Sequence, residues 1–550
     1  MKSIKKFLAV ILSMTLMLTL GTATFGAQKT LPSGKDTGSI NVTNLKPGDT
    51  VTAYQFVKAD YNEYGFTGYS AINNYVKDPV APTAQEVIDM ASNAATMTVA
   101  AEKKVATGDT EVTLNGLPVG YYLVMVTSGS ETVYSPMIAG IYYSKSATDN
   151  TLTNGAISAD SDFEIKAQKC WAKSSTPKLE KTIVTPSSKN SKGDDIAIGD
   201  KITFNLSATV PSYSKEYKKV TYKIYDIMSE GLDYVDGSMK CFIEKYENNR
   251  ENIKVTPKVN GGIIEITFDS KFILEHPGQK IQVEYQAKLN EKAGVNFDAN
   301  INKAYLEYSN NPASGSTAKT GEDKVYVYTF GIDSNLFGKS TEKWNEKTKE
   351  LIKVEEGEYQ WGETEKESGI FTTTTALEGA TFTLTNNKTK KSYTATSDKY
   401  GYLKFTGLDA GEYTLQETDA PDGFTLNDAK HTVVITAEYN QDGTLKSYTI
   451  KIDDKATSTY TATYDKGVIK TITSTKDSQG NISESAILKN SKMSFLPSTG
   501  GVGTTIFAIV GVVFVVVALG LHMILRGKSK LEQDLSLIHI SEPTRHAQIS

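Results

Sequence analysis

The clearest chemistry in the sequence lies in a pentapeptide that precedes an apolar stretch and a small basic cluster. Residues 504–525 are nearly uncharged, and as a helix of roughly 20 residues they could span about 30 Å of hydrocarbon. The basic residues after them predict that this end stays in the cytoplasm. The Thr499–Gly500 peptide bond would then lie just outside the membrane, within reach of a membrane-bound enzyme. The pentapeptide is Leu496, Pro497, Ser498, Thr499 and Gly500, and the basic residues are Arg526, Lys528 and Lys530.

The opposite end of the chain has the three regions of a secretory signal. Lys2, Lys5 and Lys6 precede an apolar run over residues 7–20, and small residues between 21 and 27 offer a cleavage site. The apolar run is too short for a permanent membrane span. We therefore expect the mature protein outside the cell membrane.

A pentapeptide of the LPxTG type is the recognition sequence of sortase transpeptidases. With the export signal, the apolar span and the basic cluster, it makes the chain resemble Gram-positive cell-wall-anchored surface proteins. This resemblance implies cleavage between Thr499 and Gly500 by a membrane-bound cysteine transpeptidase. The alternative is an ordinary tail anchor that contains the pentapeptide by chance.

Composition narrows the classes of function. The 550 residues carry a net charge of −5, so no nucleic-acid partner is implied. Two cysteines, Cys170 and Cys241, exclude a disulfide framework but leave open one bridge or two free thiols. The five histidines show no metal-ligand spacing, and no phosphate-binding loop or Ser/His/Asp arrangement is visible. We expect no enzyme acting on external substrates, no metal and no cofactor.

Short alternating apolar and polar runs, separated by turn residues, predict an all-β chain of tandem immunoglobulin-like β-sandwiches. A helical spacing over residues 83–95 adds one short helix to the first domain. Residues 343–367 are strongly charged and are interpreted as an insertion or mobile loop. The predicted segments are a signal peptide (1–27), an N-terminal domain (28–172), a middle sandwich (173–322), a third sandwich (323–491), the sorting signal with its transmembrane helix (492–530) and a tail (531–550) that resembles translated sequencing adapter.

Residues 177–312 resemble the middle domain of Gram-positive major pilins. The matching stretches are residues 177–181, 198–204, 210–211, 225–232 and 302–312. In that family a lysine on the first strand and an asparagine on the last become joined by a spontaneous amide bond, driven by a buried carboxylic acid. By motif, the resemblance assigns these roles to Lys181, Asn302 and Asp226. The alternatives without a reaction are a solvated strand-edge lysine for Lys181, a turn amide for Asn302 and a turn carboxylate for Asp226.

The residue types suit such a reaction. A lysine amine attacks only when it is neutral, and burial lowers the pKa of an amine while raising that of a carboxylic acid. A protonated acid can polarise the carboxamide and move protons as ammonia leaves, and strand packing holds the reacting groups together. By analogy with a disulfide, closing a loop of roughly 120 residues is worth on the order of 4–5 kcal/mol.

The third domain resembles the Cna protein B-type domain, which also ends major pilins. Residues 377–384 and 413–424 match its best-marked stretches, and the second of these is the pilin E box. The resemblance makes Glu417 the catalytic acid and Asn490 the amide partner. The family places the lysine a few residues after a Thr-Phe-Gly like residues 329–331. Lys339 is the first lysine available, later than expected, with Lys343 as the fallback.

A pilus shaft subunit also needs an acceptor lysine for its neighbour's Thr499. The family keeps this lysine at the junction of the first two domains, in a pattern ending Tyr-Pro-Lys. Here Trp171, Ala172 and Lys173 stand at that place, with alanine where proline is expected. Lys173 is the predicted acceptor and Lys169 its rival. The alternative is a linker lysine with no such role.

The resemblance therefore implies a structural shaft subunit of a covalent, sortase-assembled pilus on a Gram-positive cell surface. Its partners would be identical subunits, a pilin-class sortase, a housekeeping sortase and peptidoglycan, with accessory pilins and host surface ligands left open. The alternative function is a monomeric wall-anchored adhesin or accessory pilin that binds host matrix through its first domain.

Overall fold

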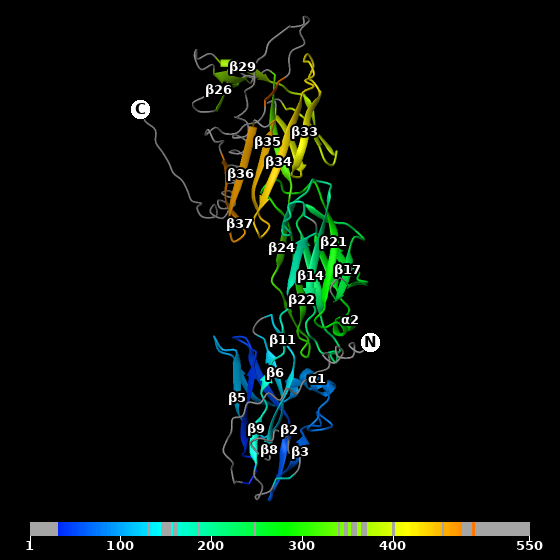
Figure 1. Cartoon of the computed structure of the whole chain (residues 1–550), viewed down its shortest axis with the longest axis vertical. Coiled ribbons are helices and arrows are strands. Elements are labelled where there is room, and N and C mark those ends of the chain that lie inside the picture. Colours follow the sequence, from blue (N-terminus) through cyan, green and yellow to red (C-terminus); the bar gives the residue numbers. More distant parts are fainter. Residues whose placement is uncertain are drawn as a thin grey trace, which may run out of the picture.

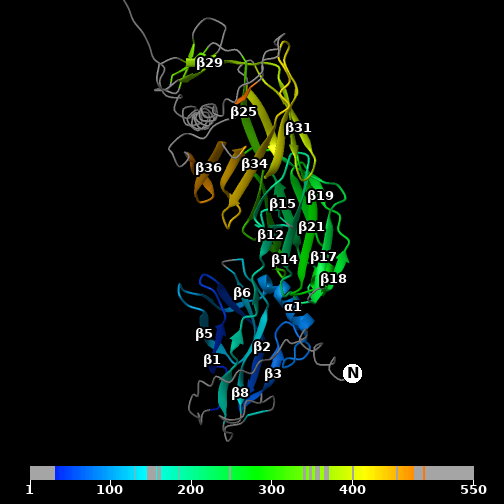
Figure 2. The ribbon, with the colours of Figure 1, turned by 45° about the horizontal axis from the view of Figure 1, so that its top comes forward.

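The computed structural model arranges the chain as three β-rich units that follow one another along the long axis (Figures 1 and 2). It describes residues 31–128, 131–144, 156–157, 163–184, 186–246, 249–338, 342–345, 350–353, 360–364, 371–398, 402–453, 456–475 and 487–489. The predicted signal peptide, sorting signal and C-terminal tail lie outside these residues. Within them, no helix is long and apolar enough to cross a membrane. The predicted all-β class is confirmed.

The first unit contains a six-stranded sheet, in which β3-β2-β6-β8-β9 are neighbours in that order and β4 also pairs with β2, and a three-stranded sheet of order β10-β1-β5. Alternate residues of these strands point inward and build an apolar core around Tyr122, Ile141 and Tyr143. The strands are β1 (Thr37–Thr43), β2 (Thr50–Asn62), β3 (Gly65–Ala71), β4 (Val99–Lys104), β5 (Glu111–Pro118), β6 (Gly120–Thr127), β7 (Val133–Tyr134), β8 (Met137–Ser144), β9 (Glu164–Ala167), β10 (Cys170–Trp171) and β11 (Ser174–Ser175).

The predicted short helix is present as α1 (Ala84–Ser92), followed by the 3₁₀ turn η2 (Ala94–Thr96). Thr83 caps its N-terminus, and the reciprocal bond from the Thr83 backbone N–H to Glu86 completes a capping box. Its buried face packs on the sheet through Val87, Met90 and Ala91. The apolar residues at helical spacing in the sequence therefore form the face of α1 that packs on the sheet.

The middle unit is a sandwich of two sheets, ordered β12-β14-β21-β17-β18 and β13-β24-β22-β15-β20-β19. The side strands β16 and β23 pair with β21 and β22, respectively. Its elements are β12 (Leu179–Ile183), β13 (Gly193–Asp195), β14 (Lys201–Thr209), β15 (Tyr222–Met228), β16 (Leu232–Tyr234), β17 (Lys240–Tyr246), β18 (Asn249–Ile253), β19 (Lys258–Asn260), β20 (Ile263–Thr267), α2 (Ser270–Glu275), β21 (Lys280–Leu289), β22 (Asn300–Asn311), β23 (Ser316–Lys319) and β24 (Asp323–Tyr328).

The third unit packs a sheet of order β31-β30-β33-β34-β35-β36-β37 with a sheet of order β28-β29-β25-β32, to which β38 adds in parallel beside β25. Its strands are β25 (Phe330–Gly338), β26 (Glu342–Asn345), β27 (Glu350–Lys353), β28 (Gln360–Thr364), β29 (Phe371–Ala376), β30 (Thr381–Asn386), β31 (Ser392–Thr396), β32 (Tyr402–Leu408), β33 (Gly411–Asp419), β34 (Lys430–Tyr439), β35 (Leu445–Ile452), β36 (Ala456–Asp465), β37 (Val468–Thr475) and β38 (Ile487–Lys489).

The charged segment 343–367 contains more regular structure than a loop. β26 and β27 pair with each other, and β28 pairs with β29 of the sheet that holds β25. The interpretation as a mobile loop was therefore wrong for these paired strands, whereas the interpretation as an insertion stays a prediction. Its charge-rich composition hides a strand pattern that is fixed by backbone pairing with neighbours.

The linker between the first and middle units is fixed by backbone pairing, and side chains of the two units meet beside it. In the linker, β11 pairs antiparallel with β7, with Ser174 opposite Tyr134. The hydroxyl of Tyr308, on β22 of the middle unit, donates to the backbone oxygen of Glu131. Val133 of the first unit also belongs to the apolar cluster of the middle unit. The linker after residue 173 is thus held on both sides.

The middle and third units share a continuous stretch of chain. β24 pairs with β22 and β13 of the middle unit, so it lies in the middle sheet although the boundary expected from the sequence falls at 322/323. Its last residue, Tyr328, packs in the third core, and its hydroxyl accepts from the Leu445 backbone N–H at 2.9 Å. Lys391 reaches back to Asp200, with 2.9 Å between Nζ and Oδ1.

Asp195, at the end of β13, is buried in this second junction. Its Oδ2 accepts from the Tyr439 hydroxyl at 2.7 Å, and its Oδ1 accepts from the Ala410 backbone N–H. Burial raises the pKa of Asp195 from 3.8 to about 6, opposed by these two hydrogen bonds and assisted by the nearby carboxylates of Asp194 and Asp409. A carboxyl group of the middle unit therefore titrates inside its contact with the third.

We expect this junction to lose stability as pH rises from about 4 to about 6, because the folded state holds a proton on Asp195 that the unfolded chain has released. Above that window the contribution is constant. The Asp195→Asn variant should lack this part of the pH dependence. Calorimetric melting at a series of pH values measures it, with exposed Asp233→Asn as control. Identical pH profiles for wild type and Asp195→Asn would contradict the assignment.

Candidate isopeptide site in the middle sandwich

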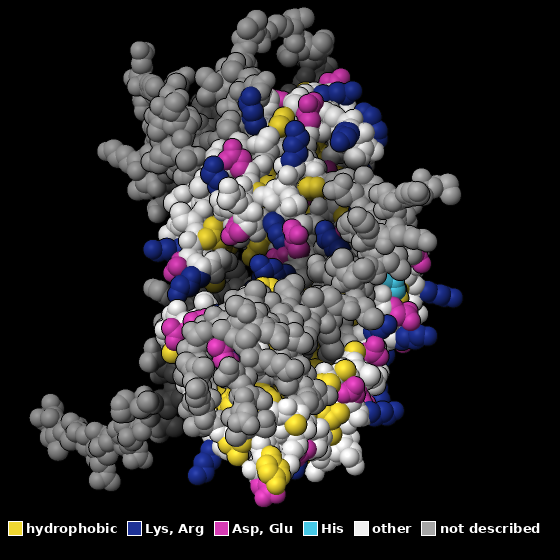
Figure 3. Space-filling model, turned by 60° about the horizontal axis from the view of Figure 1, so that its bottom comes forward, with side chains coloured by type: hydrophobic (Ala, Val, Ile, Leu, Met, Phe, Trp, Pro, Cys, Tyr) yellow, Lys and Arg dark blue, Asp and Glu magenta, His cyan; other side chains and the backbone are white. Residues whose placement is uncertain are grey.

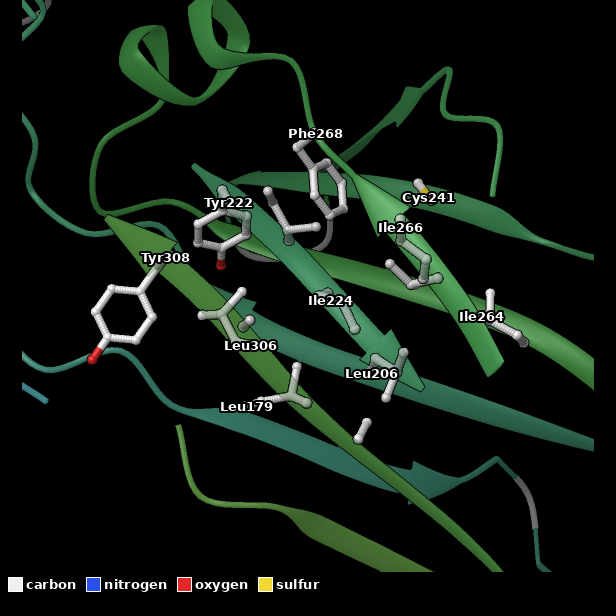
Figure 4. Close-up of a cluster of buried hydrophobic side chains, with 14 of the residues drawn as sticks. Leu179, Leu206, Tyr222, Ile224, Cys241, Ile264, Ile266, Phe268, Leu306 and Tyr308 are labelled. Atoms are coloured by element: carbon white, nitrogen blue, oxygen red, sulfur yellow. The ribbon is translucent and has the colours of Figure 1, made fainter. Parts of the chain in front are cut away.

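Three polar residues occupy inward positions that the strand pattern otherwise gives to apolar side chains. On β12, Lys181 points inward like Leu179, and on β15, Asp226 points inward like Ile224. On β22, Asn302 lies on the same inward face as Leu306. Figure 4 shows the neighbouring apolar members, including Leu179, Leu206, Ile224 and Leu306, filling the space between the two sheets. The three polar side chains are fully buried.

The structure brings the three predicted residues together across the sandwich. Lys181 comes from one sheet, whereas Asp226 and Asn302 lie on adjacent strands of the other, and Asn302 is opposite Met228. The Lys181 amine donates to Asp226 Oδ2. β22 is not the last strand of the unit, because β23 and β24 follow it. A bond between Lys181 and Asn302 would therefore join the first strand to an internal one.

Tyr285, on β21, is a fourth member that sequence reasoning missed. Its hydroxyl donates to Asp226 Oδ1 at 2.7 Å and accepts from Asn302 Nδ2 at 2.7 Å and from Lys181 Nζ at 3.0 Å. The signal in the sequence was its inward place between Val283 and Ala287 on β21. A buried tyrosine hydroxyl at such a place must find a polar partner.

The apolar surroundings set the charge state of the site. Burial lowers the pKa of the Lys181 amine, and the Asp226 carboxylate opposes the shift. The rings of Phe204 and Tyr285 lie 5.0 and 5.2 Å from Lys181 Nζ, so water is replaced by aromatic surface. Burial also raises the pKa of the Tyr285 hydroxyl well above its usual value, followed by the effect of Asp226, so the hydroxyl keeps its proton.

The backbone of Lys181 is fixed from outside the core. Its N–H donates to Asp323 Oδ2 at 2.7 Å, and its carbonyl accepts from Lys192 Nζ at 2.6 Å. Lys192 also bonds Asp323 at 2.6 Å. Asp323 begins β24, so this network ties β12 to the strand that leads into the third unit.

The arrangement can support attack of an amine on a carboxamide. The Lys181 amine, whose pKa is lowered by burial, the carboxyl group beside it and the Asn302 amide are held within one buried hydrogen-bonded cluster. The Asn302 Oδ1 atom is buried and has no hydrogen-bond partner among the described residues. No added group is required for such a reaction, since all atoms that react belong to the chain.

The second predicted set lies partly outside the described residues. Glu417, on β33, occupies an inward position and is 1% exposed, and its Oε2 accepts from the Asn427 backbone N–H at 2.6 Å. Lys339 and Asn490 are outside the described residues, as is the side chain of the fallback Lys343. The strands that directly precede the two pair in parallel, with Phe337 opposite Lys489.

Both candidate acceptor lysines are exposed near the first junction. Lys169 lies between β9 and β10, and Lys173 lies between β10 and β11. The Lys173 carbonyl accepts from the Ser135 backbone N–H at 3.0 Å, which fixes the backbone while the side chain remains in solvent. The pentapeptide Leu496–Gly500 lies outside the described residues.

The cysteines, the metal-binding residue types and the surface charges can also be described. Cys170 and Cys241 are both free and buried, and burial raises the pKa of each thiol to about 12. The described part of the chain contains no cluster of His, Cys, Asp and Glu that could hold a metal ion. Figure 3 shows Lys and Arg side chains interspersed with Asp and Glu over the described part of one face.

Three protein families match successive parts of the chain. Residues 35–174 match the T6 antigen Ig-like domain, residues 370–451 match the SpaA prealbumin-like fold domain, and residues 489–530 match the LPXTG cell wall anchor motif. The first match covers the first unit, and the second contains Glu417. The third contains the predicted sorting signal.

Known proteins resemble the chain over most of its length. The trypsin-resistant surface T6 protein of Streptococcus pyogenes serotype M6 is 26% identical over 549 residues, covering 90% of this chain and 96% of that protein. The structure of the T6 backbone pilin of that serotype aligns with a TM-score of 0.56 and 21% identity, covering 84% of this chain and 100% of that one. The major pilin SpaD of Corynebacterium diphtheriae gives a TM-score of 0.43 at 17% identity, covering 73% and 91%.

The all-β fold and the three family matches agree with the resemblance to Gram-positive major pilins that the sequence predicted. The chain is homologous to the T6 backbone pilin of Streptococcus pyogenes. Its LPXTG motif makes it a cell-wall-anchored protein of the cell surface.

Removal of the Asp226 carboxylate should be strongly destabilising, because it leaves the buried Lys181 amine with only the neutral Tyr285 hydroxyl as a partner. In a chain kept unlinked by Asn302→Ala, we expect Asp226→Ala to lower the free energy of unfolding by about 3–5 kcal/mol. The half-exposed pair of Lys303 and Glu322 provides the control, where Glu322→Ala should change it by less than about 1 kcal/mol. Denaturant unfolding of both variants measures the difference. Equal changes in the free energy of unfolding would show that the buried pair of Lys181 and Asp226 stabilises the fold no more than the exposed pair does.

Proposed function

We propose that the chain is the shaft subunit of a covalent, sortase-assembled pilus, and that its middle sandwich forms an amide bond between Lys181 and Asn302. The observation that carries the proposal is the buried cluster in which the Lys181 amine contacts Asp226 and shares the Tyr285 hydroxyl with Asn302. In a chain without a disulfide among its described residues, such a bond supplies covalent reinforcement. It cannot be reversed by reduction.

The reaction needs Lys181 neutral and Asp226 protonated. Burial favours the neutral amine, and moving the proton from the amine to the carboxyl converts the ion pair into two neutral groups. The amine then attacks Asn302 Cγ, and ammonia leaves. Asp226 is the acid that drives this step in the proposal, with the packed sheets holding amine and amide in contact.

A second amide bond in the third unit would join Lys339, with Lys343 as fallback, to Asn490, with Glu417 as the acid. Two observations support it. Glu417 is buried at an inward position of β33, and parallel pairing of β25 with β38 ends at Phe337 and Lys489, two residues before Lys339 and one residue before Asn490. One further step in this register would place Gly338 opposite Asn490, so that Lys339 would follow one residue later on the neighbouring strand.

Polymerisation follows from the sorting signal and an exposed lysine. A pilin-class sortase would cleave Thr499–Gly500, hold the Thr499 carbonyl as a thioester, and pass it to Lys173 of the next subunit, with Lys169 as rival. Repetition gives a head-to-tail fibre that does not close. A housekeeping sortase would finally transfer the fibre to a peptidoglycan amine. The subunit is structural, and accessory pilins or host ligands are further partners.

Peptide mapping of the full-length chain tests the cross-links. Each intramolecular bond should remove the mass of one ammonia and leave one branched peptide, the first linking Lys181 to Asn302 and the second ending at Asn490. Lys181→Ala should lose only the first, while Lys303→Ala on the same strand as Asn302 should lose neither. A wild-type chain that retains both ammonia masses would contradict the cross-link proposal.

Acceptor choice is tested with Lys173→Arg and Lys169→Arg, separately and together, because arginine keeps the charge but is not an amine nucleophile. In Gram-positive cells that express the chain with a pilin-class sortase, Lys173→Arg should abolish high-molecular-weight ladders on denaturing gels. Lys169→Arg should leave them intact. Ladders that survive the double substitution would refute both acceptors, and a wild type without ladders would favour the monomeric adhesin or accessory pilin.

A further inference from the structure

The Asn302 carboxamide has one hydrogen-bond partner in the described part of the chain, and it is not the carboxyl group. Its Nδ2 donates to the Tyr285 hydroxyl at 2.7 Å, while its Oδ1 has none. Asp226 instead directs Oδ2 to Lys181 and Oδ1 to Tyr285. A proton that must reach the leaving nitrogen from Asp226 therefore has Tyr285 between its source and its destination.

We propose that Tyr285 is a catalytic residue of amide formation, relaying a proton from Asp226 to the leaving Nδ2 of Asn302. This inference rests on the cross-link proposed above. It adds to the lysine, acid and asparagine a hydroxyl that touches both reacting nitrogens, at 3.0 Å from Lys181 Nζ and 2.7 Å from Asn302 Nδ2.

The step balances without any outside reactant. Lys181 Nζ attacks Asn302 Cγ, and the electron pair of the carbonyl double bond moves to Oδ1. Tyr285 gives its proton to Nδ2 and takes the proton held by Asp226. Asp226 then recovers a proton from the new Nζ–Cγ link. The Cγ–Nδ2 bond breaks, its electron pair leaves with ammonia, and the carbonyl re-forms.

The buried surroundings of Tyr285 favour a hydroxyl that passes a proton on and is reprotonated at once, and they disfavour a lasting tyrosinate. Tyr285 is fully buried between Phe204, at a ring-centroid distance of 5.5 Å, and Tyr234, at 5.9 Å. In this environment a tyrosinate would be poorly stabilised, so Tyr285 must regain a proton as it gives one away. In the structure Asp226 Oδ1 accepts from this hydroxyl at 2.7 Å. Once the carboxyl group carries its proton on Oδ1, the direction of the hydrogen bond reverses and Asp226 can supply the proton.

The test uses the full-length chain and follows the fraction of Lys181–Asn302 linked peptide over time after pulse labelling. Tyr285→Phe keeps the ring and removes the hydroxyl, and we expect linking to slow by about 10²–10⁴-fold. Tyr234→Phe removes a neighbouring hydroxyl that contacts no reacting atom, and it should link at the wild-type rate. Both variants are compared for folding in a Lys181→Ala background, where no link forms.

The outcomes separate the two proposals. Linking of Tyr285→Phe at the wild-type rate would overturn the relay and leave the cross-link in place. An unlinked wild-type chain would overturn the cross-link and the relay together. If Tyr285→Phe fails to fold, fluorotyrosine at position 285 keeps the hydroxyl and increases its acidity. A linking rate that changes with this acidity supports the relay, and an unchanged rate overturns it.

Discussion

The middle unit depends on one constraint, which is that a lysine amine lies in an apolar sandwich without access to water. An isolated charge there would be strongly disfavoured, so the amine needs either a counter-charge or loss of its proton. Asp226 provides the first and makes the second possible, because a proton can move between the two groups. Tyr285 and Asn302 complete a cluster whose members come from both sheets, so the sheets cannot shift without breaking it.

The cluster is also connected to the rest of the molecule. Lys181 is held through its backbone by Lys192 and Asp323, and Asp323 starts the strand that continues into the third unit. Asp195 on β13 lies opposite Tyr328, at the other end of β24, and binds Tyr439 and the backbone of Ala410. Covalent reinforcement of the middle unit and its contact with the third unit therefore share the segment formed by β13 and β24.

Much of this architecture was predictable from sequence, and the failures have physical causes. Alternating patterns gave the all-β class and residues 83–95 gave α1, because each reflects a face that packs on a core. Tyr285 was missed because a tyrosine in an apolar run looks like core, and its hydroxyl partners are 59 residues away at Asp226 and 17 at Asn302. Strands β26 to β28 were missed because backbone pairing, not side-chain periodicity, defines them.

The proposed bonds define where tension would run in a fibre. Force entering at Lys173 would reach Lys181, cross to Asn302, and so bypass the chain between them, including β14 and β21. It would then follow β22 to β25 into the third unit and cross near Lys339 to Asn490, shortly before Thr499. The first unit would carry no tension if Lys173 is the acceptor.

Between the two bonds only the segment 302–339 would be stretched, and there β24 is paired on both sides by β22 and β13. Rupture of those ladders requires many hydrogen bonds to yield together, so the junction is reinforced where no covalent bypass exists.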